Sequence, residues 1–272
     1  MQLAVFYHHI KEAAKQTGQS ELDILKKAKE AGITQLEFDI FDLQEKEKML
    51  LLLKESGFLV SSIYGFYDFG RKQNGTDGYA LIDAAVTFGS KKIMIIPGFY
   101  KQHISFKKQE EKNRMVEQME KMCAYAVQKD IVPTIEDFDD KKSPIAKAEQ
   151  MLSFAKLLPD LKITFDTGNF MYSAQPELEA YEILRGRIVH VHCKDRALYP
   201  LEGTSFKEAV DKKKLYPASV GSGSVAMTDI LRNLKTDGYD GTLTIEHFDT
   251  SNYFECMLKS AEWLTHTWEE LK

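Results

Sequence analysis

Short apolar runs alternate with longer amphipathic segments about eight times along the chain. The short runs are rich in residues that favour strands, whereas the longer segments repeat their apolar positions at the spacing of a helix. Strands are predicted at residues 3–7, 35–38, 59–63, 92–96, 132–136, 163–166, 188–192 and 242–246. Helices are predicted at residues 20–31, 44–56, 76–88, 107–129, 143–158, 227–236 and 252–271.

The regular order of strand, helix and strand predicts a parallel sheet. Gly32, Gly57, Gly89 and Gly238 each follow a predicted helix, where glycine commonly forms the C-terminal cap, and a strand begins soon after. Parallel strands need a crossover connection, and a helix is the usual one. Eight such units favour a single (β/α)8 TIM barrel over residues 1–272. The long connection at residues 196–220 is expected to be an insertion or a mobile loop.

The alternative architecture is an open, doubly wound sheet. Its dinucleotide-binding version carries a GxGxxG motif directly after the first strand, and this chain has no such motif there. The barrel is therefore the preferred prediction.

Composition excludes some classes of function but does not distinguish between folds. Hydrophobic residues make up 43% of the chain and charged residues 28%, which is ordinary for a globular protein with a full core. The formal net charge of −5 gives no basic footprint for a phosphate backbone, so a nucleic-acid partner is not expected.

The cysteines and the N-terminal segment indicate the cellular compartment in which the protein is expected. Cys123, Cys193 and Cys256 cannot all pair with one another, and their spacing is that of neither a zinc ribbon nor a redox motif. The first residues lack a secretory signal, and the apolar run at residues 49–53 is too short to span a bilayer. We expect a cytoplasmic protein without a membrane partner.

Four consecutive predicted strands end on a residue that can bind a metal: Glu136, Asp166, His192 and Glu246. Side chains alternate along a strand, so these four share one face with the residues two positions earlier, which are Thr134, Thr164, His190 and Thr244. The apolar residues between them, Ile135, Phe165, Val191 and Ile245, would face the helices. In TIM barrels the active site lies at the C-terminal strand ends, where the four metal-capable residues stand.

Three carboxylates and one imidazole form a mixed oxygen and nitrogen site, which suits one divalent ion among Mn²⁺, Mg²⁺, Co²⁺ and Zn²⁺. Any one such residue could instead be a helix cap or a solvated loop residue, but the shared inward parity of all four favours a common site. His190 is interpreted as a hydrogen-bonded residue of the inner layer. The remaining histidines are expected to be structural or exposed, although His103 follows the fourth strand and could reach the cleft.

Four short motifs in this order resemble the xylose isomerase-like barrels of the sugar phosphate isomerase/epimerase superfamily. They are Thr134-Ile135-Glu136, Phe165-Asp166-Thr167-Gly168-Asn169, Val189-His190-Val191-His192-Cys193-Lys194-Asp195, and Gly238-Tyr239-Asp240-Gly241 followed by Leu243-Thr244-Ile245-Glu246. Gly221-Ser222-Gly223 is similar to a glycine-rich loop that precedes the final helix and strand of the family, or is a plain turn. The chain departs from the pattern at Asn169, where many members have histidine, and at Phe138, where many have a polar residue.

The resemblance implies a metal-dependent isomerase or epimerase acting on a small sugar or sugar-like polyol ketone through an enediolate. It makes Glu136, Asp166, His192 and Glu246 the metal ligands, with Glu136 and Glu246 doubling as the catalytic proton-transfer pair. A metal bound to a carbonyl oxygen and the neighbouring hydroxyl acidifies the adjacent C–H bond, so that a carboxylate can remove the proton.

Substrate contacts are expected from residues close to these motifs. Lys194 and Asp195 could hold substrate hydroxyls or orient the imidazole, Asn169 stands at a substrate-contact position of the family, and Arg196 could meet an anionic group. Tyr64, with Phe66, Phe99 and Tyr100, could wall the cleft. The absence of a glycine-rich phosphate loop favours an unphosphorylated substrate.

Three alternatives stay open from the sequence. A lyase similar to inosose dehydratase would expel a β-hydroxyl from the same enediolate. A hydrolase similar to endonuclease IV would need further histidines where Tyr64-Gly65-Phe66 and Pro97-Gly98-Phe99 stand. A non-catalytic binding barrel would hold a ligand without turnover. The oligomeric state is also open, a homo-oligomer included.

Overall fold

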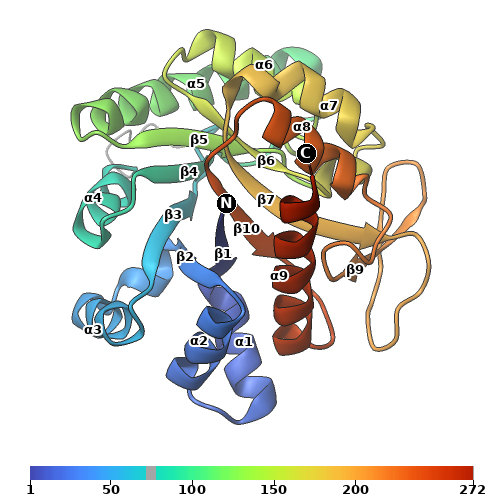
Figure 1. Ribbon diagram of the computed structural model, residues 1–272. Coiled ribbons are helices and arrows are strands. Elements are labelled where there is room, and N and C mark those ends of the chain that lie inside the picture. Colours follow the sequence, from blue (N-terminus) through green and yellow to red (C-terminus); the bar gives the residue numbers. More distant parts are fainter. Residues whose placement is uncertain (72–77, 272) are drawn as a thin grey trace.

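The computed structural model describes residues 1–71 and 78–271, and in these ranges eight parallel strands close into a barrel (Figure 1). The barrel order is β1, β2, β3, β4, β5, β6, β7 and β10, and β10 pairs with both β7 and β1. The strands span Gln2–Phe6, Ile33–Asp39, Leu59–Phe66, Lys92–Ile96, Val132–Glu136, Lys162–Asp166, Ile188–Ala197 and Thr242–Glu246. Pairing of β10 with β1 excludes the open sheet, which would leave two free edges.

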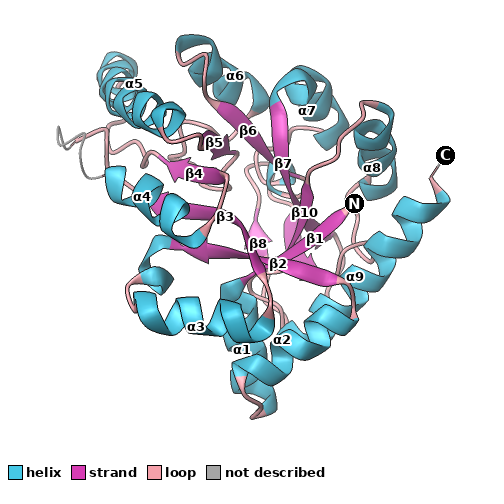
Figure 2. Ribbon diagram, turned by 60° about the vertical axis from the view of Figure 1, so that its left-hand side comes forward, coloured by secondary structure: helices cyan, strands magenta, loops and turns pink. Residues whose placement is uncertain are grey.

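The helices form a ring around the strands (Figure 2). They are α1 Tyr7–Thr17, α2 Glu21–Glu30, α3 Lys46–Ser56, α4 Tyr79–Phe88, α5 Ser105–Gln128, α6 Ala148–Leu157, α7 Glu177–Leu184, α8 Met227–Thr236 and α9 Tyr253–Glu270. Short 3-10 turns lie at η1 Ile40–Leu43, η2 Asn169–Met171 and η3 Arg185–Arg187. In the described ranges no helix is both long and apolar enough to cross a membrane.

The helix predictions were incomplete in three places. Helices α1 and α7 were not predicted, because α1 begins on the residue after β1 without a connecting loop and α7 has only 8 residues. The helix predicted to begin at Ser143 begins at Ala148, since the Ser143 hydroxyl accepts the Ile145 N–H and holds a turn. The predicted start of α4 at Thr76 lies outside the described residues.

Alternation along the strands divides the core as predicted. Ile135, Phe165, Val191 and Ile245 are fully buried in the layer between barrel and helices, where the Phe165 ring contacts Phe170 and Tyr181 at centroid distances of 5.3 and 5.7 Å. The opposite parity faces the barrel axis and is polar, with Thr134 Oγ1 and Thr164 Oγ1 2.7 Å apart. Burial of the outward set stabilises the barrel by roughly 1.5–3 kcal/mol for each large side chain.

The long connection after the seventh strand is an insertion, the first of the two predicted alternatives, and it contains strands that were not predicted. Strand β7 continues through Ala197, and β9 (Lys214–Ala218) pairs with its end in antiparallel fashion. The two-residue strand β8 (Lys207–Glu208) pairs in turn with β9. This hairpin stands beside the end of β7 (Figure 1), so residues far along the connection return to the C-terminal mouth of the barrel.

The packing predicts a large cost for truncating Phe165. Phe165→Ala should lower the free energy of unfolding by about 3–5 kcal/mol, because it leaves a cavity between β6 and α7. Leu157→Ala is the matched control, since Leu157 is 57% exposed on α6; its effect should stay within roughly 0.5 kcal/mol. Denaturant unfolding of both variants measures the difference, and similar losses would contradict the assignment of Phe165 to the core.

Candidate metal centre and cavity

The structure brings the four predicted strand-end residues together at the C-terminal mouth of the barrel. Glu136, Asp166, His192 and Glu246 are buried, and each offers one ligand atom within 4.8 Å of the others. His192 Nδ1 contacts Glu136 Oε1 and lies 3.3 Å from Glu246 Oε2. Closure of the barrel explains the convergence, because neighbouring parallel strands end on the same side.

Only one carboxylate oxygen of Asp166 accepts hydrogen bonds from the described residues. Oδ1 accepts the backbone N–H groups of Gly168 and Asn169, both at 2.7 Å. Oδ2 is buried and receives no hydrogen bond from the described residues. Glycine at position 168 allows the backbone to pass close to β7, because a Cβ there would lie 2.7 Å from the Lys194 carbonyl oxygen. An orphaned carboxylate oxygen facing two further carboxylates and an imidazole fits a divalent cation.

Lys194 supplies a fixed positive charge beside this cluster. Its buried ammonium pairs with Glu246 Oε1, lies 3.3 Å from Asp166 Oδ2 and donates to Asn169 Oδ1 at 2.8 Å. The pKa of the ammonium is raised despite burial, because Asp166 and Glu246 favour its charged form. One lysine cannot balance three carboxylates.

The pKa values of the acidic groups reflect burial and the excess of negative charge in the cluster. Burial is the largest cause for each group, and it raises the pKa of Glu136 and Asp166. For Glu246 the attraction of Lys194 and His192 outweighs burial and lowers the pKa. Asp137, which was not predicted, has a pKa well above its usual range through burial and the neighbouring charge of Asp166. A divalent ion would relieve the repulsion and favour the ionised form of its ligands.

Glu37 is a second residue that the sequence analysis missed. It lies in β2, is buried and accepts a hydrogen bond from His192 Nε2 at 3.1 Å and from His190 Nε2 at 2.9 Å. The interpretation of His190 as a hydrogen-bonded inner-layer residue is therefore confirmed. The available signal was an acidic residue between Leu36 and Phe38 inside a predicted strand, at inward parity.

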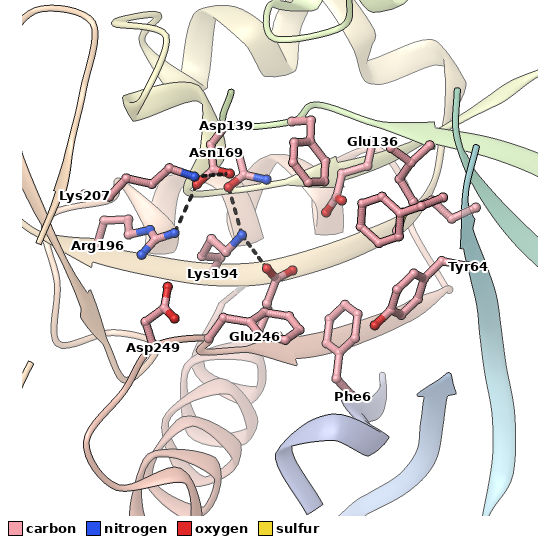
Figure 3. Close-up of a pocket in the computed structure, with 15 residues that line it drawn as sticks. Phe6, Tyr64, Glu136, Asp139, Asn169, Lys194, Arg196, Lys207, Glu246 and Asp249 are labelled. Carbon is pink, nitrogen blue, oxygen red and sulfur yellow. Dashed lines mark hydrogen bonds and ion pairs between the residues drawn. The ribbon is translucent and has the colours of Figure 1, made fainter. Parts of the chain in front are cut away.

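A cavity of about 340 Å³ opens above the cluster, and its wall has two halves (Figure 3). One half is apolar and comes mainly from the early strands and the loops after β5 and β10. The other half is mostly charged and comes from β7, the hairpin, η2 and the loops after β5 and β10. The apolar half comprises Phe6, Tyr64, Phe66, Met94, Ile96, Phe138 and Phe248, and the charged half Asp139, Asn169, Lys194, Arg196, Lys207 and Asp249. Glu136 and Glu246 border the cavity between these halves.

Four of the five residues predicted as substrate contacts line this cavity: Tyr64, Asn169, Lys194 and Arg196. The structure contradicts the fifth, Asp195. Its carboxylate accepts the N–H groups of Arg196, Gly221, Gly223 and Val225 at 2.8–3.2 Å and so anchors the glycine-containing loop. The reason is strand alternation, which turns Lys194 and Arg196 toward the cavity and Asp195 away from it.

Three further residues that were expected near the cleft, two aromatic residues and one histidine, do not line the cavity. Phe99 packs against the apolar residues of the wall without lining the cavity. Tyr100 is half-buried and bonded through its N–H to the Lys142 carbonyl, and His103 is exposed. The cleft is instead walled by Phe6, Phe138 and Phe248 beside Tyr64 and Phe66.

The charged half contains an ion cluster that no local pattern indicated. Asp139 Oδ2 lies 3.3 Å from Arg196, and Asp139 Oδ1 lies 2.7 Å from the Lys207 ammonium. Lys207 comes from β8, so the hairpin supplies one wall of the cavity. Its position follows from antiparallel pairing with β9, which the sequence analysis did not predict.

Comparisons with known proteins agree with this architecture. The family model described as Xylose isomerase-like TIM barrel matches residues 25–267. No curated protein sequence matches the chain. At 14–20% identity, the solved structures show similarity of fold alone.

Three of these structures illustrate the likeness. The IOLI protein with a bound zinc atom has a TM-score of 0.76 and 18% identity, over 100% of this chain and 99% of that chain. The probable 3-DHS dehydratase AsbF from Bacillus anthracis has a TM-score of 0.73 and 18% identity, over 97% and 99%. D-allulose 3-epimerase from Methylomonas sp. has a TM-score of 0.73 and 14% identity, over 98% of each chain. The family match over most of the chain, together with the closed barrel, means that this protein belongs to the xylose isomerase-like TIM barrel family.

Proposed function

We propose that this protein is a divalent-metal-dependent isomerase or epimerase that acts on a small sugar or sugar-like polyol ketone by proton transfer through an enediolate. The observation that carries the proposal is the buried cluster of three carboxylates and one imidazole on the floor of a cavity of about 340 Å³. Likeness to a D-allulose 3-epimerase and to a protein with bound zinc agrees with it.

Glu136, Asp166, His192 and Glu246 would hold one divalent ion. Asp166 Oδ2 receives no hydrogen bond from the described residues, and His192 Nδ1 is directed at Glu136 and Glu246, which supports their assignment as ligands. Carboxylate and imidazole donors suit Mn²⁺, Mg²⁺, Co²⁺ or Zn²⁺. When bound, such an ion polarises a carbonyl oxygen and the neighbouring hydroxyl, which acidifies the C–H bond between them.

Proton transfer is assigned to Glu136 and Glu246, the two cluster carboxylates that border the cavity. They come from β5 and β10 and can approach a substrate carbon from different sides. One group acts as an ionised carboxylate and removes the proton. The other enters as a carboxylic acid and delivers its own proton to the opposite face of the same carbon or to the adjacent carbon. The first result is epimerisation and the second is isomerisation.

The other cavity residues would orient the substrate. The Lys194 ammonium can donate to the substrate oxygen on which negative charge develops. Asn169 and Arg196 offer hydrogen-bond donors to hydroxyls in the charged half. The apolar half can pack against C–H faces of the carbon skeleton. A cavity of about 340 Å³ suits one small molecule rather than a polymer.

The second candidate is a lyase on the same site, which the likeness to a probable 3-DHS dehydratase favours. In that reaction the same carboxylate removes the proton, and the electron pair then expels the β-hydroxyl instead of being reprotonated. The carboxylic acid just formed gives its proton to the departing hydroxyl, which leaves as water. An endonuclease IV-like hydrolase is not proposed, because Tyr64, Phe66, Met94 and Ile96 make the mouth apolar at the ends of β3 and β4.

The metal assignment predicts one divalent ion per chain. Glu246→Gln should weaken binding by more than the roughly 10- to 100-fold typical of residues outside the ligand set, because it removes a charged ligand. Asp249→Asn is the control, since Asp249 lines the cavity but lies outside the cluster. Elemental analysis measures the metal content of each protein, and a competition titration measures its affinity for the ion. Equal binding by wild type and Glu246→Gln would contradict the site.

The proton-transfer assignment predicts solvent exchange at carbon. In deuterated water, wild-type protein should introduce deuterium into recovered ketose or its epimer, measured by mass spectrometry. Glu136→Gln should lower the exchange rate by roughly 10²- to 10⁴-fold, the range for loss of a general acid or base. A dehydrated product would favour the lyase, and exchange unchanged in Glu136→Gln would exclude its carboxylate as the base.

A further inference from the structure

Glu37 is a fully interior carboxylate beneath the candidate metal centre, and it does not line the cavity. Its Oε2 atom receives three polar groups: His190 Nε2 at 2.9 Å, His192 Nε2 at 3.1 Å and Thr244 Oγ1 at 3.2 Å. Its Oε1 atom has no hydrogen-bond partner in the described residues. Within those residues no lysine or arginine forms an ion pair with Glu37, so the histidine and threonine groups carry its stabilisation.

We interpret these contacts as hydrogen bonds, although the ligand atoms of Glu37, His190 and His192 also lie close enough to surround an ion. Hydrogen bonds of the N–H···O type span about 2.7–3.2 Å. Both N···O distances at Glu37 Oε2, 2.9 and 3.1 Å, lie in the hydrogen-bond range. Glu37 and His190 are also closed off from the cavity, with exposed fractions of 1% and 0%.

The hydrogen bond between His192 Nε2 and Glu37 determines whether Nδ1, the other ring nitrogen, is available to bind a metal. An ionised carboxylate only accepts hydrogen bonds, so His192 Nε2 must carry the hydrogen toward Glu37. Nδ1 is the nitrogen directed at Glu136 and Glu246. When an ion binds between these groups, the ring would be neutral and Nδ1 would carry the lone pair that the ion needs. A half-turn of the ring would present carbon to both sides and lose this bond. The Phe6 ring, 4.9 Å from the imidazole centroid, packs against it and further restricts such a turn.

We propose that Glu37 is the positioning residue that makes Nδ1 of His192 a metal donor, through the hydrogen bond at Nε2; this inference rests on the metal site of the proposed function. Glu37 neither lines the cavity nor contributes a ligand atom to the four-residue cluster, so it acts through His192. A carboxylate behind a metal-binding histidine fixes the tautomer and ring orientation and makes the imidazole a stronger donor.

The test measures affinity for Co²⁺, by its visible absorption and by competition, in two variants of Glu37. Glu37→Gln keeps an oxygen that can accept the His192 N–H but removes the charge, and Glu37→Leu removes both. Affinity should fall roughly 10-fold in the first and 100-fold or more in the second, the range for residues of this kind. In zinc-loaded protein, the His192 Nε2–H resonance should be shifted downfield in wild type and lose that shift in Glu37→Leu.

Thr134→Val is the matched control, because it removes a buried hydrogen bond of the inner layer without contacting His192. Its Co²⁺ affinity should stay within about threefold of wild type, since the two sites share no partner. Melting of each metal-free variant reports folding separately. Wild-type affinity in Glu37→Gln and Glu37→Leu would overturn this inference alone. Failure of wild type to bind any divalent ion would overturn both this inference and the proposed function.

Discussion

Repulsion between buried carboxylates is the constraint on which the mouth of this barrel depends. Glu136, Asp166 and Glu246 lie close together away from water, where the interaction between like charges is strong. Lys194 offsets part of the excess, and His192 lies between two of the three carboxylates. The remaining imbalance is the physical basis of the proposed affinity for a divalent cation, because a bound ion would relieve the repulsion.

Strand β7 shows how alternation turns a linear sequence into a site. His190, His192, Lys194 and Arg196 face the interior in succession, and their surroundings change from the barrel core to the cavity. Val191, Cys193 and Asp195 face the other way, where Asp195 anchors the loop at Gly221 and Gly223. Because β7 extends beyond the barrel, the same element also carries the hairpin that delivers Lys207.

The proposed function would place the chemistry and the recognition of a substrate in different parts of the cavity. Glu136 and Glu246 of the cluster border the cavity between a wall rich in aromatic rings and a wall rich in charge. Such a division allows one part of a small substrate to pack on apolar surface while another part forms hydrogen bonds. The charged wall is built partly by the hairpin, so substrate preference in this fold can change without altering the four residues of the centre.

The sequence by itself determined the order of the eight barrel strands and the convergence of four strand ends. Both follow from local information: alternation within a strand, glycine at helix ends, and the rule that barrel strands end at one mouth. The tertiary structure alone decided the partners of those residues. Glu37 and His192 are 155 positions apart, and Asp139 meets Lys207 across a hairpin that has only a two-residue first strand. Such contacts depend on barrel closure and on the stagger between strands, which no short segment specifies.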